Sequence, residues 1–458
     1  MRPRRLRSAA VGAEPAVWPR LPGPAGAHLL ALLRQFEQSQ WIAPDTLEQR
    51  QWRQLPFLLA QAATLRPYRR RFAAAGFNPA APDPQAFRRI QPLRRADIQA
   101  AGGGLFCTPP AMHGETSLRF TSGSTGTPIQ FASTDLERRF WSAFTLREHA
   151  WHRRDLSGVH AFLRPGEARQ WPTWGPPADL VCATGRAARF STSEPVEVQA
   201  EWLAGLDPDY LLTMPSNLAE LVREFDRRGI RLPRLREVRT VGEVVSDDLR
   251  RWVREAWGVR IADIYSASEA GYLALECPQA EGRYHVQAEG VLLEVLRADG
   301  RPCAPGEIGE VVVTPLHNFA MPLVRYAIGD FAEVGGPCPC GRGLPVLARI
   351  LGRVRNMLTL PDGGRRWPLF GLNDLPGIPL RQYRIVQRSA TRLEAQLVVD
   401  RPLRPDEEDR IRAALRGRLH PDFQVDLVYP AFLPRDPSGK FEDFINACPP
   451  AEGTPGMP

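Results

Sequence analysis

The sequence predicts an α/β protein with a large N-terminal domain, a β-rich region within it, and a small α+β domain at the C-terminus. From about residue 160 onward, short apolar runs alternate with helical segments, which is typical of a buried sheet covered by helices. Between about 290 and 335 the pattern changes to strands separated by Asp-Gly and Pro-Gly turns. A compact unit of about 100 residues follows the basic stretch at 352–356. We therefore expect one domain at residues 1–352 and a second at 353–458.

The individual elements follow from local patterns. Residues 26–75 have helical periodicity, with leucines recurring on one face. In the α/β region we expect strands at 211–213, 238–241 and 261–265 and helices at 216–228 and 247–257. In the β-rich region we expect strands at 291–295, 309–314 and 323–326. In the C-terminal unit we expect strands at 383–386, 393–399 and 425–428 and a helix at about 405–418.

The composition favours a cytoplasmic globular protein. Hydrophobic residues make up 43% of the chain and charged residues 24%, which is ordinary for a protein with a sizeable core. No run of about 18 apolar residues is present, so we expect neither a transmembrane helix nor a membrane partner. Prolines interrupt the segment after the basic start at Met1–Arg7, which argues against a secretory signal. Seven cysteines in a chain of 458 residues do not make a disulfide framework.

The net charge of +8 and the pI of about 9.4 raise the question of a nucleic-acid partner. The basic residues are scattered, however, and the densest run, Arg69–Arg71, lies in a segment that is expected to be helical. No recognition helix or aromatic-interleaved basic pattern accompanies it. We interpret the charge as a solvated surface and expect no nucleic acid, although a zinc-stabilised nucleic-acid-binding protein remains a remote alternative.

Lysine is almost absent from this chain. Among 59 basic residues the only lysine is Lys440, and arginine supplies the rest. Lysine and arginine are not equivalent, because the ammonium is a compact point charge whereas the guanidinium is a broad planar fork. Lys440 is therefore a candidate for a catalytic role, although a surface lysine that was retained by chance is also compatible with its position.

A glycine- and hydroxyl-rich loop is the sharpest local signal. It follows the strand-like segment 117–120 and consists of Thr121, Ser122, Gly123, Ser124, Thr125, Gly126 and Thr127, before Pro128. Its glycines permit tight turns, and its hydroxyl and N–H groups can surround phosphate oxygens. It lacks the lysine of a Walker A loop. From composition alone, a polar surface loop explains these residues equally well.

Together with further motifs in the same order, this loop resembles the phosphate loop of the adenylate-forming superfamily, which includes acyl-CoA synthetases, adenylation domains and luciferases. The other matching segments are Val241-Gly-Glu243, Asp263-Ile-Tyr-Ser-Ala-Ser-Glu269, Arg325-Tyr-Ala-Ile-Gly-Asp330, Ile350-Leu-Gly-Arg353 and Pro437-Ser-Gly-Lys440. The closest branch is the phenylacetate–CoA ligase-like one, whose N-terminal region residues 65–98 resemble. The resemblance implies a large multi-layer adenylate-forming domain with a β-rich subdomain and a small mobile C-terminal domain.

The resemblance also implies roles for individual residues. Glu243 would approach the adenine, Tyr265 would stack on it within a motif that includes Ser268, and Asp330 would accept bonds from the ribose hydroxyls. Glu269 would hold Mg²⁺, and Arg353 would stand next to the hinge. Lys440 would be the catalytic residue, bridging the substrate carboxylate and the α-phosphate of ATP. Glu269 and Lys440 are therefore the expected catalytic pair.

Four separated residues have the composition of a structural zinc site. Cys277 and His285 lie eight residues apart, and Cys338 and Cys340 follow about 50 residues later, an arrangement similar to that of the same branch. Three thiolates and one imidazole form a closed tetrahedral set with no open position, so we expect structural Zn²⁺. Four unrelated buried residues are the alternative.

The reaction implied is the ATP-dependent activation of a carboxylic acid, aromatic or otherwise hydrophobic, to an acyl-adenylate, followed by transfer to a thiol such as that of CoA. The sequence departs from the family at the hinge, where Arg355 replaces an acidic residue, and in the loop 358–367. Adenylation is therefore better supported than CoA transfer, and an amide- or ester-forming ligase, a carrier-protein-loading enzyme and a catalytically inactive relative remain alternatives. The aromatic residues Phe140, Trp141, Phe144 and Trp174 are equally plausible in the acid pocket and in the core, and a homodimer is left open.

Overall fold

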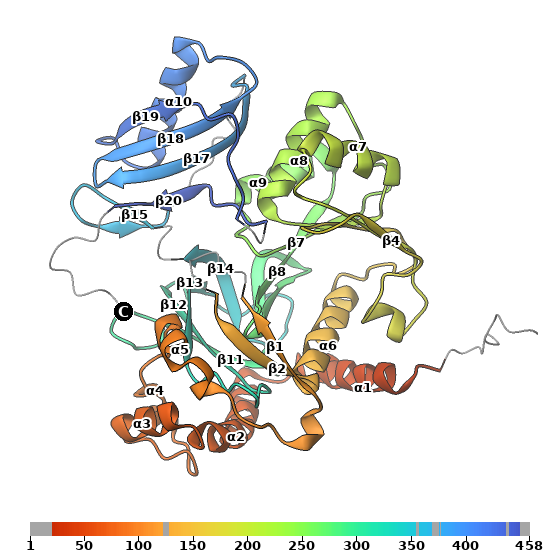
Figure 1. The fold of residues 1–458 in the computed structure, drawn as a ribbon, viewed down its shortest axis with the longest axis vertical. Helices are drawn as coiled ribbons and strands as arrows, with labels where there is room; N and C mark the ends of the chain where they lie inside the picture. Colours follow the sequence, from red (N-terminus) through yellow and green to blue (C-terminus); the bar gives the residue numbers. More distant parts are fainter. Residues whose placement is uncertain are drawn as a thin grey trace, which may run out of the picture.

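The apolar periodicity of residues 26–75 produces three helices, and two shorter ones follow. The computed structural model describes residues 21–121, 128–353, 357–368, 375, 377–436 and 439–448 (Figure 1). The first helices are α1 (Pro24–Ser39), α2 (Pro44–Ala63), α3 (Arg66–Ala75), α4 (Pro84–Arg88) and α5 (Arg95–Ala101). A proline stands in the first turn of α1 to α4, where its missing N–H costs no hydrogen bond. No helix among the described residues is both long enough and apolar enough to cross a bilayer.

A mixed sheet of twelve strands forms the centre of the described chain. Its strand order is β11-β12-β13-β14-β10-β9-β8-β7-β6-β3-β5-β4. The parallel part consists of β3 (His160–Leu163), β5 (Ala187–Phe190), β6 (Tyr210–Thr213), β7 (Glu237–Val241) and β8 (Arg260–Ala267). The antiparallel part consists of β9 (Gly271–Cys277), β10 (Ala280–Val286), β11 (Val291–Leu296), β12 (Ile308–Pro315), β13 (Tyr326–Val334) and β14 (Val346–Arg353), and β4 (Arg169–Trp171) pairs with the other edge. A separate hairpin joins β1 (Thr116–Phe120) to β2 (Gln130–Thr134).

Helices cover both faces of the parallel strands. On one face, α7 (Val196–Leu206), α8 (Pro215–Arg228) and α9 (Asp247–Trp257) bury alternate strand residues such as Ala161 and Leu163. The other face packs against α6 (Asp135–Trp151) and α1. Because strand side chains alternate between faces, the intervening residues of β3, β6 and β7 point toward α6. This second face is important for the site described below.

The C-terminal residues form an α+β unit with its own core. Its four-stranded sheet has the order β19-β18-β17-β20, formed by β17 (Leu380–Ser389), β18 (Arg392–Val399), β19 (Gln424–Val428) and β20 (Phe444–Asn446). The helix α10 (Pro405–Arg418) covers this sheet, and a small hairpin pairs β15 (Leu358–Thr359) with β16 (Arg365–Arg366). The unit lies beside α8 and α9 (Figure 1). The predicted fold class, a large α/β domain with a small α+β domain, is confirmed, whereas the hinge residues 354–356 lie outside the described residues.

The strand predicted at 323–326 is wrong for most of its length. Only Tyr326 belongs to β13, and Leu323 to Arg325 form a turn in which Arg325 has φ of +51°. Left-handed backbone is strained for a residue with a side chain, and it persists only where surrounding contacts fix it. The guanidinium of Arg325 is buried, forms an ion pair with Glu294 at 2.9 Å, and donates to the carbonyls of Arg88 and Ile90. Arg325 thereby attaches the N-terminal helices to the β-rich part of the sheet.

Arg325→Ala should lower the free energy of unfolding by about 3–5 kcal/mol, because it leaves Glu294 and two carbonyl oxygens without their donor. Urea unfolding followed by circular dichroism measures this change. Arg301→Ala is the matched control, since its pair with Asp299 is exposed and should contribute less than about 1 kcal/mol. Equal stability of the two variants would contradict the anchoring role.

Candidate active site

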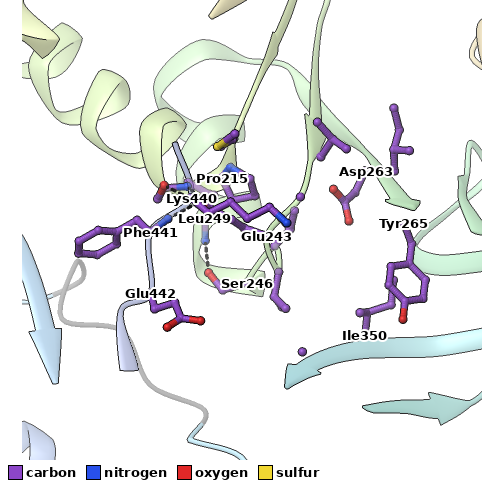
Figure 2. Close-up of a pocket in the computed structure, with 18 of the residues that line it drawn as sticks. Pro215, Glu243, Ser246, Leu249, Asp263, Tyr265, Ile350, Lys440, Phe441 and Glu442 are labelled. Carbon is purple, nitrogen blue, oxygen red and sulfur yellow. Dashed lines mark hydrogen bonds between the residues drawn. The ribbon is translucent and has the colours of Figure 1, made fainter. Parts of the chain in front are cut away.

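A cavity of about 1450 Å³ lies between the carboxyl ends of the parallel strands and the C-terminal unit. Its lining comes from the ends of β6, β7 and β8, from β13 and β14, and from the segment that carries Lys440 (Figure 2). In open α/β sheets, ligands bind outside the carboxyl ends of the strands, because the loops there converge on a crevice. The motif residues that line this cavity are Thr121, Glu243, Tyr265, Ser268, Glu269, Asp330, Arg353 and Lys440.

Tyr265, Asp330 and Arg353 form one hydrogen-bonded group. The Tyr265 hydroxyl donates to Asp330 Oδ2 at 3.0 Å, and Arg353 Nε lies 3.5 Å from Asp330 Oδ1. The last two residues face each other in the pairing of β13 with β14. Burial, reinforced by the Asp330 carboxylate, raises the pKa of Tyr265 well above its usual value, so the phenol stays protonated. The sheet thus places a flat aromatic ring beside a carboxylate.

Glu269 lies at the end of the same motif and lines the same cavity as Thr121, the first residue of the glycine- and hydroxyl-rich loop. Its Oε1 accepts a bond from the Tyr326 hydroxyl at 3.1 Å, and the side chain is buried. Thr121 Oγ1 accepts bonds from Ile129 N at 3.0 Å and from Arg95 at 3.2 Å, which fixes where the loop starts. The loop residues Ser122, Gly123, Ser124, Thr125, Gly126 and Thr127 lie outside the described residues. Their predicted contact with phosphate therefore stays a prediction.

Lys440 enters the cavity from the C-terminal unit. Figure 2 shows its side chain extending toward the side on which Asp263 and Tyr265 lie. A Cβ atom at Gly242 would lie 3.3 Å from Lys440 Cε, and Gly242 has φ of +91°, so the lysine passes closely over a residue that favours glycine. Asp436 makes two hydrogen bonds with the backbone of Lys440. Its N–H donates to the Lys440 carbonyl at 2.9 Å, and its carboxylate accepts from the Lys440 N–H at 3.0 Å.

Glu243 connects the two parts of the chain. Its carboxylate accepts bonds from the Ser216 N–H at 2.8 Å, from the Ser216 hydroxyl at 3.0 Å and from the Phe441 N–H at 2.6 Å. Burial raises the pKa of Glu243, although these donors oppose the effect. The resemblance implies that Glu243 approaches adenine. In this arrangement its carboxylate also holds the residue next to Lys440.

Further contacts between the two parts involve residues that no sequence motif indicated. Arg435 forms an ion pair with Glu220 and donates to the Ser216 hydroxyl at 2.5 Å. The same Glu220 accepts a bond from Gln382 at 2.7 Å, and Arg381 pairs with Glu197 at 2.6 Å. These polar contacts hold the C-terminal unit against α7 and α8.

The four predicted metal ligands lie together. The ligand atoms of Cys277, His285, Cys338 and Cys340 are all within 4.8 Å of one another. Cys338 Sγ lies 3.7 Å from Cys277 Sγ, and Cys340 Sγ lies 3.2 Å from His285 Nε2. A tetrahedral zinc ion with bonds of about 2.3 Å to sulfur would place two sulfurs about 3.8 Å apart, so the donor set fits this metal.

The cluster borders the strand that carries the nucleotide motif. Glu276, the neighbour of Cys277, accepts bonds from the Asp263 N–H at 2.8 Å and from Arg250 at 2.7 Å. Asp263 in turn accepts bonds from the hydroxyls of Tyr284 and Thr240 at 2.9 and 2.6 Å. A group that fixes Cys277 therefore also supports the position of β8.

One of the four candidate aromatic residues lines the cavity. Trp141 does so and packs edge-on against Tyr272. Phe144 is buried and stacks on Phe36, and Phe140 stacks on His317. Trp174 is also buried, and its indole N–H donates to the Gly158 carbonyl at 2.7 Å. The latter three belong to the core.

Comparisons with known proteins agree with this geometry. No model of a protein family matches the sequence. The phenylacetate–coenzyme A ligase of Thermus thermophilus is 26% identical over 421 residues, which cover 83% of this chain and 91% of that protein. The phenylacetate–coenzyme A ligase of Escherichia coli is 25% identical over 341 residues, covering 69% and 73%.

The architecture is shared with a solved structure, that of 2-hydroxyisobutyryl-CoA ligase in the postadenylation state. It is 20% identical, covers 90% of this chain and 91% of its own, and has a TM-score of 0.71. The same ligase in its thioesterification state gives a TM-score of 0.60. The resemblance that the motifs predict is thus confirmed: the chain is similar to phenylacetate–coenzyme A ligases over most of its length and has the fold of the adenylate-forming enzymes.

Proposed function

We propose that this protein activates a carboxylic acid with ATP as an acyl-adenylate and then passes the acyl group to the thiol of CoA. The observation that supports this function is the convergence of Tyr265, Asp330, Glu269 and Lys440 on one cavity, although they come from separate parts of the chain. The similarity to phenylacetate–coenzyme A ligases supports the same reaction class and the use of CoA.

The nucleotide would bind along the strand ends. Tyr265 would stack on the adenine, and Asp330, braced by Arg353, would accept bonds from the ribose hydroxyls. The loop that begins at Thr121 would surround the leaving phosphates with N–H and hydroxyl donors. Glu269 would hold Mg²⁺, which when bound neutralises charge on the phosphate oxygens.

In the first step, a carboxylate oxygen of the acid attacks the α-phosphorus of ATP, the acyl–phosphate bond forms, and pyrophosphate leaves. Two anions approach each other, so positive charge between them lowers the barrier. The Lys440 ammonium would lie between the carboxylate and the α-phosphate, where a compact cation fits better than the fork of an arginine. In the second step, the thiol attacks the acyl carbon, loses its proton, and AMP leaves.

The Cys277, His285, Cys338 and Cys340 cluster would hold a structural Zn²⁺. All four ligand positions would be filled by protein atoms, so the ion has no vacancy for a substrate and its role would be to join β9, β10 and the loop before β14. Such a site contributes to folding, because the unfolded chain does not bring these ligands together.

Lys440→Ala should reduce acid-dependent ATP–pyrophosphate exchange about 10²- to 10³-fold, because one charge contact made in the transition state is lost. Exchange of labelled pyrophosphate into ATP measures this step alone. Transfer of a preformed acyl-adenylate to CoA is the control and should continue, because Lys440 acts in the first step. Exchange at the rate of the unaltered protein would refute the assignment of Lys440.

Replacing CoA with an amine tests for an amide-forming ligase.

Glu220→Gln should slow adenylation about fivefold, since the half-buried pair with Arg435 contributes about 1 kcal/mol to holding the C-terminal unit over the cavity. The transfer step should change little. Glu201→Gln is the matched control, because Glu201 pairs with Arg228 within the large domain. The two half-reactions are measured separately at saturating ATP. If both slow equally, or if Glu201→Gln has the same effect, the docking role is wrong.

About one zinc ion should be present per chain, and Cys338→Ser should lose it and lower the thermal midpoint. The reason is that a missing thiolate opens the tetrahedral set and leaves strands β9 and β10 less constrained. Elemental analysis and differential scanning fluorimetry measure the two effects. Cys303→Ser, outside the cluster, should keep the metal. A folded, carefully purified sample with little zinc would exclude the site.

A further inference from the structure

The wall of the cavity that faces α6 contains more charge than an apolar acid would require. Residues Phe162, Leu212 and Arg239 lie in one row across three neighbouring parallel strands, and all three line the cavity. They belong to the strand face that points toward α6, from which Trp141 and Thr145 contribute to the same wall. The row is apolar except at its end, where a guanidinium takes the place of a hydrophobic side chain.

Arg239 is held rigidly with one edge turned to the cavity. The residue is 4% exposed, and its Nε and Nη2 both bind the carboxylate of Glu148, which is itself buried. Glu148 also pairs with Arg154 at 2.6 Å. The remaining nitrogen of Arg239, Nη1, has no hydrogen-bond partner among the described residues. This nitrogen is not among the fully enclosed atoms that lack a partner, so it is open to the cavity and can donate to a ligand group that binds there.

The charges around this wall do not balance. Arg154 and Arg239 are compensated by Glu148 and Glu237, which pairs with Arg154 at 2.5 Å. A further cation, Arg164, follows β3 and lines the cavity without an ion pair or side-chain hydrogen bond among the described residues.

The titratable groups near Arg164 do not supply a negative charge that would balance it. Partial desolvation beside the cavity, together with repulsion from Arg239, lowers the pKa of Arg164, although its side chain stays exposed to solvent. Burial also lowers the pKa of both His149 and His160 well below the usual value, so these rings are neutral. The uncompensated charge on this wall is therefore positive.

The distance from the reacting centre sets the size of the ligand. Lys440 lies over Gly242, the residue that follows β7, and Arg239 lies three residues earlier on the same strand. At about 3.3 Å per residue, these two positions are roughly 10 Å apart. An acid whose carboxylate reaches Lys440 would therefore place its far end near Arg239.

We propose that the acid activated by this protein carries a second acceptor group, a carboxylate, at its far end, and that Arg239 and Arg164 bind it. The substrate class is then a dicarboxylic acid with an apolar spacer, aromatic or aliphatic, that spans on the order of 7–10 Å between its two acid groups, comparable with the backbone separation of Arg239 and Gly242. The spacer packs against Trp141, Phe162 and Leu212. This inference rests on the proposed function, since it describes the acid of that same reaction. A purely apolar acid would remove water from both guanidinium groups and return no acceptor, which is unfavourable.

Matched pairs of acids test this inference in the unaltered protein. ATP–pyrophosphate exchange is measured with octanedioate against octanoate and with 4-carboxyphenylacetate against phenylacetate. We expect kcat/KM to be at least tenfold higher for the diacid in one or both pairs. If the monoacids support exchange as well as the diacids, the inference is overturned and the proposed function stands. If no acid in a wider panel supports exchange, the proposed function fails.

A double variant assigns the preference to Arg239. Arg239→Met combined with Glu148→Gln removes both charges of the buried pair, and the glutamine oxygen remains as an acceptor for Arg154. The ratio of diacid to monoacid kcat/KM should fall toward one. An unchanged ratio in the folded variant would overturn the role of Arg239. Arg164→Gln, at an exposed position, should lower the same ratio and decides the matter if the double variant does not fold.

Discussion

The carboxylate of Glu243 holds the segment that carries Lys440, the proposed catalytic cation. It is half-buried just beyond the end of β7 and accepts hydrogen bonds both from Ser216, at the start of α8, and from the N–H of Phe441. Holding the backbone of residue 441 also holds the backbone of Lys440, which keeps the start of the lysine side chain near Gly242 while this bond is intact. A half-buried carboxylate accepts such bonds more strongly than an exposed one because water competes less. The geometry of the proposed adenylation centre therefore depends on one acceptor shared between two domains.

Strand β7 consequently contributes to both ends of the proposed acid site. Gly242, just beyond its last residue, leaves room for Lys440, whereas Arg239, within the strand, is braced by Glu148 from α6. Because the strand is rigid and paired on both sides, the separation between the two ends is fixed. A site of this kind selects acids by length as well as by charge, since a shorter acid reaches only one of the two cations. Preorganised groups of this type lose little entropy on binding.

The sequence predicted those parts of the site that the chemistry restricts to few residue types. Tyr265, Asp330 and Lys440 lie in motifs whose order could be recognised, and the four candidate metal ligands were indicated by their Cys and His composition and their spacing. The Arg239–Glu148 pair could not be found in this way, because its members are 91 positions apart and each is one among many arginines and glutamates. The error at Leu323 to Arg325 has a local cause: an apolar run resembles a strand, and only tertiary contacts impose the left-handed backbone of Arg325. The fold class could be predicted because the periodicity of apolar residues shows which positions are buried. It does not show which buried residues contact one another.

The contacts between the two domains are suited to a reversible arrangement. Arg435 with Glu220, Gln382 with Glu220, and Arg381 with Glu197 are polar, and both side chains of the first pair are partly exposed. Water can replace such bonds at little cost, whereas a large apolar contact would hold the domains together permanently. The C-terminal unit has its own hydrophobic core, so it can separate from α8 without unfolding. In the proposed reaction, adenylation and transfer place different demands on the space around the acyl carbon, and a lysine carried by a separable domain would satisfy the first without obstructing the second.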